Sequence, residues 1–101
     1  MPKEYIVYKI EFNNKIIYIG RTNNLKRRTY QHNYNLRKGK GGMLYQFCRD
    51  NALEELILTP THIYKNKVES KRMEMFLILS NYFENNGKLS LYQKVPNISD
   101  R

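Results

Sequence analysis

The chain has 101 residues and a formal net charge of +9, and 41% of its residues are hydrophobic. This composition fits one domain with a modest core and excludes a disordered acidic tail, a collagen-like repeat and, because no apolar run approaches about 20 residues, a membrane span. The N-terminus lacks the apolar segment of a signal peptide, so we expect an intracellular protein, cytoplasmic or in the nucleoid or nucleus, that is not secreted.

The first predicted elements form an antiparallel hairpin followed by a helix. Residues 5–12 are rich in β-branched and aromatic types and predict a strand, residues 13–15 supply turn residues, and residues 16–20 predict a second strand that ends in a glycine. Helix signals then extend over residues 25–37, with a capping residue among positions 22–24.

The middle of the chain predicts elements of both kinds. A glycine-rich basic loop, residues 38–42, precedes a short helix over residues 43–51. Residues 56–64 predict a third strand, which Pro60 confines to a sheet edge or interrupts. Residues 89–95 predict a last short strand.

A long helix is predicted from the capping box of Asn66 and Glu69 to about Glu84. Its centre, residues 75–79, is apolar all round, which predicts burial on every side and makes this helix the expected spine of the core. Together the elements predict an α+β fold, a small three-stranded antiparallel sheet flanked by helices, in a single domain over residues 1–101.

The positive charge is concentrated in one part of the sequence. From Phe12 to Arg49 there is no acidic residue, and the nine cations of that segment equal the net charge. They are Lys15, Arg21, Lys26, Arg27, Arg28, Arg37, Lys38, Lys40 and Arg49, and they are interleaved with Tyr18, Tyr30, Tyr34 and Tyr45, which can stack on bases. This pattern favours nucleic-acid binding over a surface kept basic for solubility, and over membrane binding, which would require an amphipathic helix.

The cysteine and histidine count excludes an ordinary structural zinc site, since the chain has one cysteine, Cys48, and two histidines. Cys48 lies in an apolar stretch and is expected to be a small buried hydrophobe. A metal ion would therefore have to be held by oxygen, which suits magnesium or manganese.

A set of polar residues suits the hydrolysis of a phosphodiester. Its members are Tyr8 and Tyr18 on the hairpin strands, Arg21, Arg28 and His32 just after them, all able to share one face, and Glu74 beside the apolar helix centre. Arginines bind phosphate in a bidentate way, and a tyrosine hydroxyl can orient water, or deprotonate it if cationic neighbours lower the tyrosine pKa. An acid beside a buried segment favours metal binding by Glu74 over an ion pair with Lys71 or Arg72.

The sequence resembles the GIY-YIG nuclease superfamily over about residues 5–80, which leaves a C-terminal tail at residues 88–101. The resemblance is carried by Ile6-Val7-Tyr8, by Tyr18-Ile19-Gly20, by the stretch from Arg21 to His32 and by RMEMFLI around Glu74. It implies an endonuclease that acts on DNA with one Mg²⁺ or Mn²⁺ ion, while the sequence leaves RNA open as a substrate.

The resemblance also implies roles for individual residues. It places Tyr8, Tyr18, Arg28, His32 and Glu74 at the catalytic positions, with Glu74 as the metal ligand. Arg21 and Asn97 match positions expected to bind substrate. Independently of the resemblance, Lys26 and Arg27 are expected to be backbone-phosphate contacts or solvated charges and not catalysts. Ile6 departs from the family pattern, because the first triplet of the family has glycine there.

Two other hypotheses stay open. A nucleic-acid-binding module that keeps the fold but lacks turnover is supported by Ile6 and by the lack, in this sequence, of the accessory domain usual in the family. A small basic RNA-associated structural protein explains the charge but neither Glu74 nor the tyrosine pair. A lone nuclease domain would act as a homodimer or through a separate targeting partner.

Overall fold

The structure is a computed structural model that describes residues 3–84 and residue 91. Its elements are β1 (Tyr5–Phe12), β2 (Lys15–Thr22), α1 (Leu25–Arg37), α2 (Met43–Asp50), β3 (Thr59–Tyr64) and α3 (Lys67–Glu84). The strand predicted over residues 89–95 falls, apart from Leu91, outside the described residues, as does Asn97.

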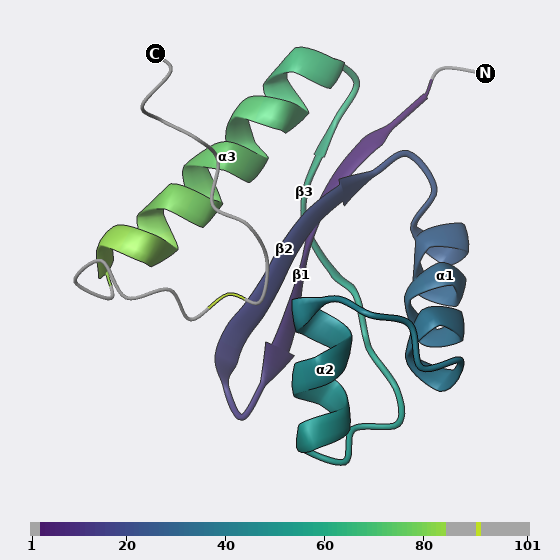
Figure 1. Cartoon of the computed structure of the whole chain (residues 1–101). Coiled ribbons are helices and arrows are strands. Elements are labelled where there is room, and N and C mark those ends of the chain that lie inside the picture. The colour runs from purple at the N-terminus through teal and green to yellow at the C-terminus, as the bar shows by residue number, and fades with distance from the viewer. Residues whose placement is uncertain (1–2, 85–90, 92–101) are drawn as a thin grey trace.

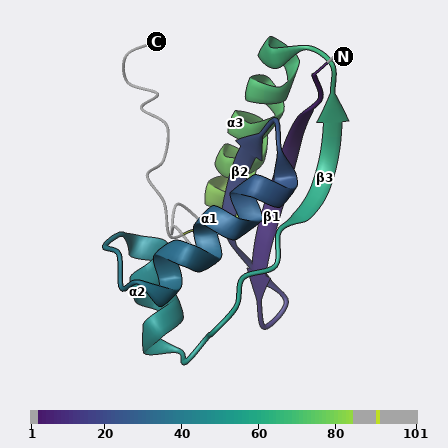
Figure 2. The same ribbon diagram turned by 90° about the vertical axis from the view of Figure 1, so that its right-hand side faces the viewer.

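The three strands form one antiparallel sheet in the order β2-β1-β3, which confirms the predicted α+β fold. Helices α1 and α2 cover one face of the sheet and α3 covers the other (Figure 1, Figure 2). Because alternate residues of a strand point to opposite faces, β1 contributes to two cores. Tyr8 and Ile10 pack on the side of α1 and α2, whereas Val7 packs on the side of α3 with Ile78.

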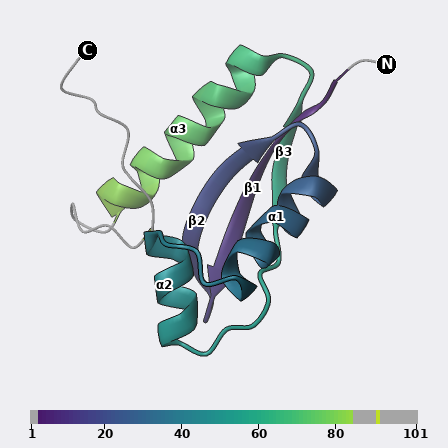
Figure 3. The same ribbon diagram turned by 45° about the vertical axis from the view of Figure 1, so that its right-hand side comes forward.

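A tight turn at Asn13 and Asn14 connects β1 to β2. Asn13 and Asn14 both have positive φ, 52° and 64°, a conformation that asparagine tolerates and that the tightest hairpin turns require. After the turn, β2 leads directly into α1, which lies on the same face as α2 (Figure 3). The end of β2 and the first turns of α1 are thereby neighbours.

The third strand begins later than predicted, at Thr59. Residues 56–58 are held by α1 instead of the sheet, because the Asn33 side chain accepts from the Leu56 N–H at 2.7 Å and donates to the Leu56 carbonyl at 3.1 Å. Pro60 lies in an outer strand at a register shift, where a proline is tolerated.

The long helix begins where predicted, since Asn66 Oδ1 accepts the N–H of Val68 at 2.7 Å and of Glu69 at 3.3 Å. The prediction that its centre is buried on every side is wrong. Ile78 is buried, but Phe76 is 61% exposed. A helix that packs on one face of a sheet buries one stripe, whatever the composition of its other sides. None of the helices in the described part of the chain combines the length and apolarity needed to cross a bilayer.

Candidate active site

Tyr8 and Tyr18 form the centre of the candidate site, on the face covered by α1 and α2. Their rings are stacked with centroids 6.2 Å apart; Tyr8 is fully buried and Tyr18 is half-buried. Gly20 lies opposite Tyr8 and leaves room for its ring, because a Cβ at that position would be 2.5 Å from Tyr8 Cζ. Gly20 therefore has a steric function, whereas Ile6 occupies an ordinary paired position of β1.

A chain of hydrogen bonds connects the tyrosine pair to α2. His32 Nε2 is 2.9 Å from the Tyr8 hydroxyl, and His32 Nδ1 is 2.9 Å from the Tyr45 hydroxyl, which accepts from Asn35 Nδ2 at 3.2 Å. Because the Tyr45 oxygen accepts from Asn35, its proton is available to His32, and we assign the His32 tautomer that accepts at Nδ1 from Tyr45 and donates from Nε2 to Tyr8. The donors then run in one direction, from Asn35 to Tyr8.

Arg28 supplies the positive charge beside the tyrosines. It lies one turn before His32 on α1, and its guanidinium hydrogen-bonds the Tyr8 hydroxyl. Its charge acts on Tyr8, Tyr18 and His32, which places it within electrostatic reach of all three. The structure therefore brings these four predicted site residues together.

Burial outweighs the charge of Arg28 at both tyrosines. Desolvation is the largest cause that raises the pKa of Tyr8 and of Tyr18 above the ordinary value, and Arg28 only partly offsets it. The condition for a tyrosine to deprotonate water, a lowered pKa, is thus not met. Both side chains stay protonated phenols at neutral pH, which suits them to orient a water molecule and not to deprotonate it.

His32 is held between Tyr8 and Tyr45 by hydrogen bonds at both ring nitrogens. Burial, and to a smaller extent the charge of Arg28, lowers the pKa of His32 to about 4, so that the ring is neutral at pH 7. Its side chain is buried and both ring nitrogens are hydrogen-bonded to tyrosines. Since no ring nitrogen is left for a phosphate, the geometry gives His32 the part of a positioning residue.

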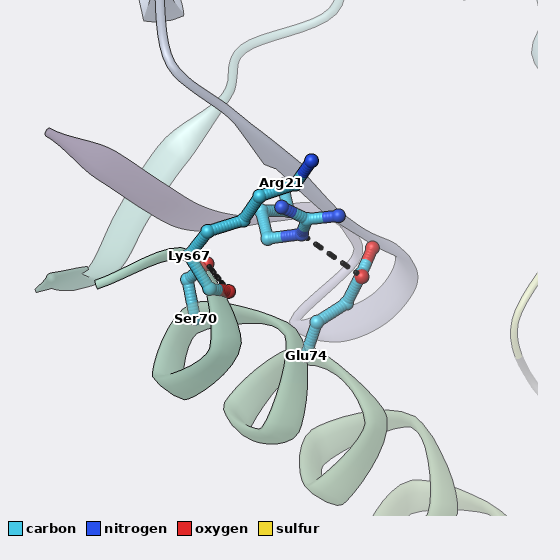
Figure 4. Close-up of polar contacts among 4 residues, drawn as sticks. All are labelled: Arg21, Lys67, Ser70 and Glu74. Carbon is cyan, nitrogen blue, oxygen red and sulfur yellow. Dashed lines mark hydrogen bonds and ion pairs between the residues drawn. The ribbon is translucent and has the colours of Figure 1, made fainter. Parts of the chain in front are cut away.

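Arg21 and Glu74 lie on the other face of the sheet. Strand alternation places Arg21 opposite Val7, on the α3 side, so the expectation that it shares the tyrosine face is wrong. Its Nε is 3.6 Å from Glu74 Oε1, and the two side chains point toward one another (Figure 4). Arg21, and neither Lys71 nor Arg72, is thus the ion-pair partner of Glu74 in the described residues.

Glu74 is still electrostatically coupled to the tyrosine pair. Burial and the neighbouring Tyr45 are the main causes that raise the pKa of Tyr18, and the charge of Arg28 lowers it. The negative charge of the Glu74 carboxylate makes a smaller contribution that also raises it. This coupling is consistent with the topology, because β2 is an outer strand and groups from the two faces can meet around its edge. The Glu74 carboxylate is therefore within electrostatic reach of Tyr18, although it projects from α3 on the opposite face of the sheet.

The donor set at Glu74 fits a single hard cation. The ion pair with Arg21 is too long for a hydrogen bond, and the buried Arg21 Nε has no hydrogen-bond partner in range, so the carboxylate oxygens keep lone pairs for a metal. Within residues 3–84 and 91, no three His, Cys, Asp or Glu side chains gather. One carboxylate is sufficient for Mg²⁺, which usually keeps several waters and takes further oxygens from substrate phosphates.

The remaining predicted residues lie apart from the tyrosine pair. Lys26 and Arg27 are exposed on the first turn of α1, and Cys48 is fully buried, where burial raises the pKa of its thiol. No role for Asn35 is predicted from the sequence, and Tyr45 is predicted only as a tyrosine that can stack on bases. The position of Tyr45 beside His32 depends on how α2 packs against α1, and no motif in the sequence indicates it.

Comparison with protein families matches residues 4–97 to the GIY-YIG catalytic domain. Neither the curated proteins nor the solved structures include a match to the chain.

Proposed function

Since the chain belongs to the GIY-YIG family, whose catalytic domain is that of a nuclease, we propose that it is a divalent-metal-dependent endonuclease that hydrolyses phosphodiester bonds in DNA. The observation that carries the proposal is the convergence of Tyr8, Tyr18 and Arg28 on one side of β2, with the Glu74 carboxylate within electrostatic reach of Tyr18. Tyrosine hydroxyls, a guanidinium and a carboxylate are the groups that water-dependent cleavage of a phosphodiester requires.

Each residue has a distinct part in this proposal. Arg28 binds the scissile phosphate and balances the charge that develops on its oxygens. The Tyr18 hydroxyl orients the attacking water, and the Tyr8 ring stacked on Tyr18 holds that side chain in place. Hydrolysis adds water across the P–O ester bond: the oxygen of water joins phosphorus, and the leaving oxygen ends with a proton.

Glu74 would hold one Mg²⁺ or Mn²⁺ ion, which supplies stabilisation of the charge on the phosphate when bound. Arg21 orients the Glu74 carboxylate and is placed to bind a neighbouring phosphate of the substrate. Exposed Lys26 and Arg27 contact backbone phosphates farther out, and Asn97 is a further substrate contact by prediction. A single site cuts one strand at a time, so cleavage of both strands would use a second copy of the chain, whereas a separate partner would serve to target it.

Plasmid cleavage tests this proposal. Purified protein incubated with supercoiled plasmid and Mg²⁺ or Mn²⁺ is expected to produce nicked circles first and linear DNA later. Arg28→Ala and Glu74→Gln should slow cutting severely while DNA binding persists. The matched controls Arg49→Ala and Glu54→Gln, which change exposed residues of the same types, should cut like the wild type. Full activity of Glu74→Gln would contradict the proposal.

A nucleic-acid-binding module without turnover is the second candidate. The observation that favours it is the Arg21–Glu74 ion pair, which partly neutralises the carboxylate expected to hold the metal. Wild-type protein that binds plasmid tightly and leaves it uncut with either metal would establish this alternative and exclude the endonuclease.

A further inference from the structure

Two exposed tyrosines on α1 lie outside the site described above. Tyr30 is 64% exposed and Tyr34 is 40% exposed, and their rings stack with centroids 6.1 Å apart and 27° between the planes. The buried residues of α1, which include His32 and Leu36, lie on other sides of the helix. The tyrosine pair therefore presents a flat aromatic surface away from the core.

Lysines continue this surface at both ends. Lys26, Tyr30, Tyr34 and Lys38 follow one another at four-residue intervals, which places them in one stripe about 18 Å long at 1.5 Å per residue. Lys38 Nζ lies 5.8 Å from the centroid of the Tyr34 ring. The helix has no acidic residue, so nothing on it neutralises the stripe.

The aromatic rings and lysines of the stripe match single-stranded nucleic acid better than a membrane or a second protein chain. Flat aromatic rings between cations match a ligand that alternates flat bases with phosphates, as single-stranded nucleic acid does. A membrane surface would require bulky aliphatic residues beside the cations, and a second copy of the stripe would repel the first.

We propose that this stripe, formed by Lys26, Tyr30, Tyr34 and Lys38, binds an unpaired segment of the nucleic-acid substrate, with bases stacked on the tyrosines and phosphates beside the lysines. The inference rests on the proposed endonuclease function and narrows its substrate to nucleic acid that is single-stranded next to the scissile bond. Bases inside a duplex are stacked on one another and offer no free face to the tyrosines.

A small polar hollow connects the stripe to the site. It has a volume of about 110 Å³ and is lined by Thr22, Asn23, Asn24, Arg27, Arg28 and Gln31. Arg28 belongs to the site, whereas Arg27 and Gln31 stand three residues before Tyr30 and Tyr34 and are their neighbours on the helix. A strand that leaves the site past Arg28 therefore reaches the tyrosines over a continuous polar surface.

Binding measurements on the full chain without divalent metal test the stripe independently of cleavage. Fluorescence anisotropy with a single-stranded oligonucleotide and with the blunt duplex of the same sequence gives the two affinities. Stacking contributes about 1–3 kcal/mol per base, so the double variant Tyr30→Ala/Tyr34→Ala should bind the single strand at least about tenfold more weakly and the duplex within about twofold of the wild type. Phe76→Ala removes an exposed aromatic ring from α3 and should change neither affinity.

A spectroscopic variant reports the stacking directly. The chain has no tryptophan, so Tyr34→Trp introduces a single indole whose fluorescence should be quenched by the single strand and much less by the duplex. Absence of quenching at saturating oligonucleotide, or unchanged single-strand affinity in the double variant, would overturn the inference. If the protein stacks single strands but cuts no DNA with either metal, only the proposed endonuclease activity is refuted. If the wild type cuts DNA but the double variant binds single strands normally, only the proposed role of the stripe is refuted.

Discussion

His32 shows how burial decides the chemistry of a single residue. Its pKa is lowered to about 4, chiefly by burial, so the ring is neutral at pH 7 and can accept a hydrogen bond from Tyr45 while it donates to Tyr8. A charged imidazolium would donate from both nitrogens and reverse one of these bonds. The direction of the hydrogen-bond chain, and with it the orientation of the Tyr8 hydroxyl, depends on the neutral ring.

The buried ring makes stability depend on pH. In the unfolded chain His32 titrates near its ordinary pKa of 6.5, so between pH 6.5 and about 4 the unfolded state binds more protons, and stability falls as the pH falls through this window. Urea unfolding at pH 7 and pH 4.5 should show wild type losing about 2–3 kcal/mol more than His32→Gln. The exposed His62→Gln variant should keep the wild-type pH dependence, and an equal loss in His32→Gln would contradict the account.

Tyr45→Phe tests the positioning of His32. The variant removes the hydroxyl that bonds His32 Nδ1 and leaves that nitrogen without its donor, a loss of about 1–3 kcal/mol. We expect the cleavage rate at saturating DNA to fall by about tenfold or more while the Kd for DNA stays within about twofold. Tyr5→Phe, at the start of β1, serves as control. A matching fall in affinity with an unchanged rate would mean that Tyr45 contacts DNA instead.

At the scale of elements, the β1–β2 hairpin positions Tyr8 through its contact with Gly20 on the neighbouring strand. The register opposes Tyr8 with Gly20, and the Tyr8 ring lies across the space that a side chain at position 20 would occupy. Only a glycine in β2 lets the Tyr8 hydroxyl reach His32 on α1. The hairpin and α1 therefore depend on each other at this point.

Gly20→Ala should displace the Tyr8 ring. The added Cβ would lie 2.8 Å from Tyr8 Cε2 and closer to the end of the ring, so we expect a loss of about 1–3 kcal/mol in stability and a large loss of cleavage. Thermal unfolding and plasmid cleavage measure the two effects. Gly41→Ala is the matched control, because a Cβ there meets nothing within 4 Å. Wild-type cleavage by Gly20→Ala would show that Tyr8 needs no such space.

The sequence predicts elements that local chemistry determines, and it fails where packing decides. The hairpin, the helix over residues 25–37 and the cap at Asn66 follow from strand composition, turn residues and capping side chains. Phe76 is exposed because α3 packs on the sheet through one side only, and Arg21 faces α3 because of the position of that residue in β2. The periodicity of the sequence does not say which helices cover which face of the sheet. The raised pKa of Tyr8 likewise depends on burial, which competes with the nearby cations that the sequence does reveal.

At the scale of the whole molecule, the net charge of +9 lies in the segment from Phe12 to Arg49, which builds β2, α1 and α2. These elements carry or adjoin the tyrosine site, whereas α3 mixes both signs. A basic surface on one side draws a polyanion toward the site and releases counterions when it binds.

Salt dependence measures this surface. If about half of the nine cations contact phosphates, the logarithm of the DNA association constant should fall with the logarithm of salt concentration with a slope of about −4 or steeper. Replacing both Lys26 and Arg27 by Gln should reduce the slope by about 2. The same change at Lys71 and Arg72, an exposed pair on α3, should leave it unchanged. A flat salt response would show that the basic segment does not bind the phosphates.

The central claim is that Arg28 and Glu74, on opposite sides of β2, serve one hydrolytic site. The most direct test is a cycle of single-turnover cleavage rates at saturating DNA and Mg²⁺ for Arg28→Ala, Glu74→Gln and the double variant. Groups that act as one unit are strongly non-additive, so the double variant should be little slower than the slower single variant. Rate losses that multiply, or a single variant that cuts at the wild-type rate, would contradict the claim.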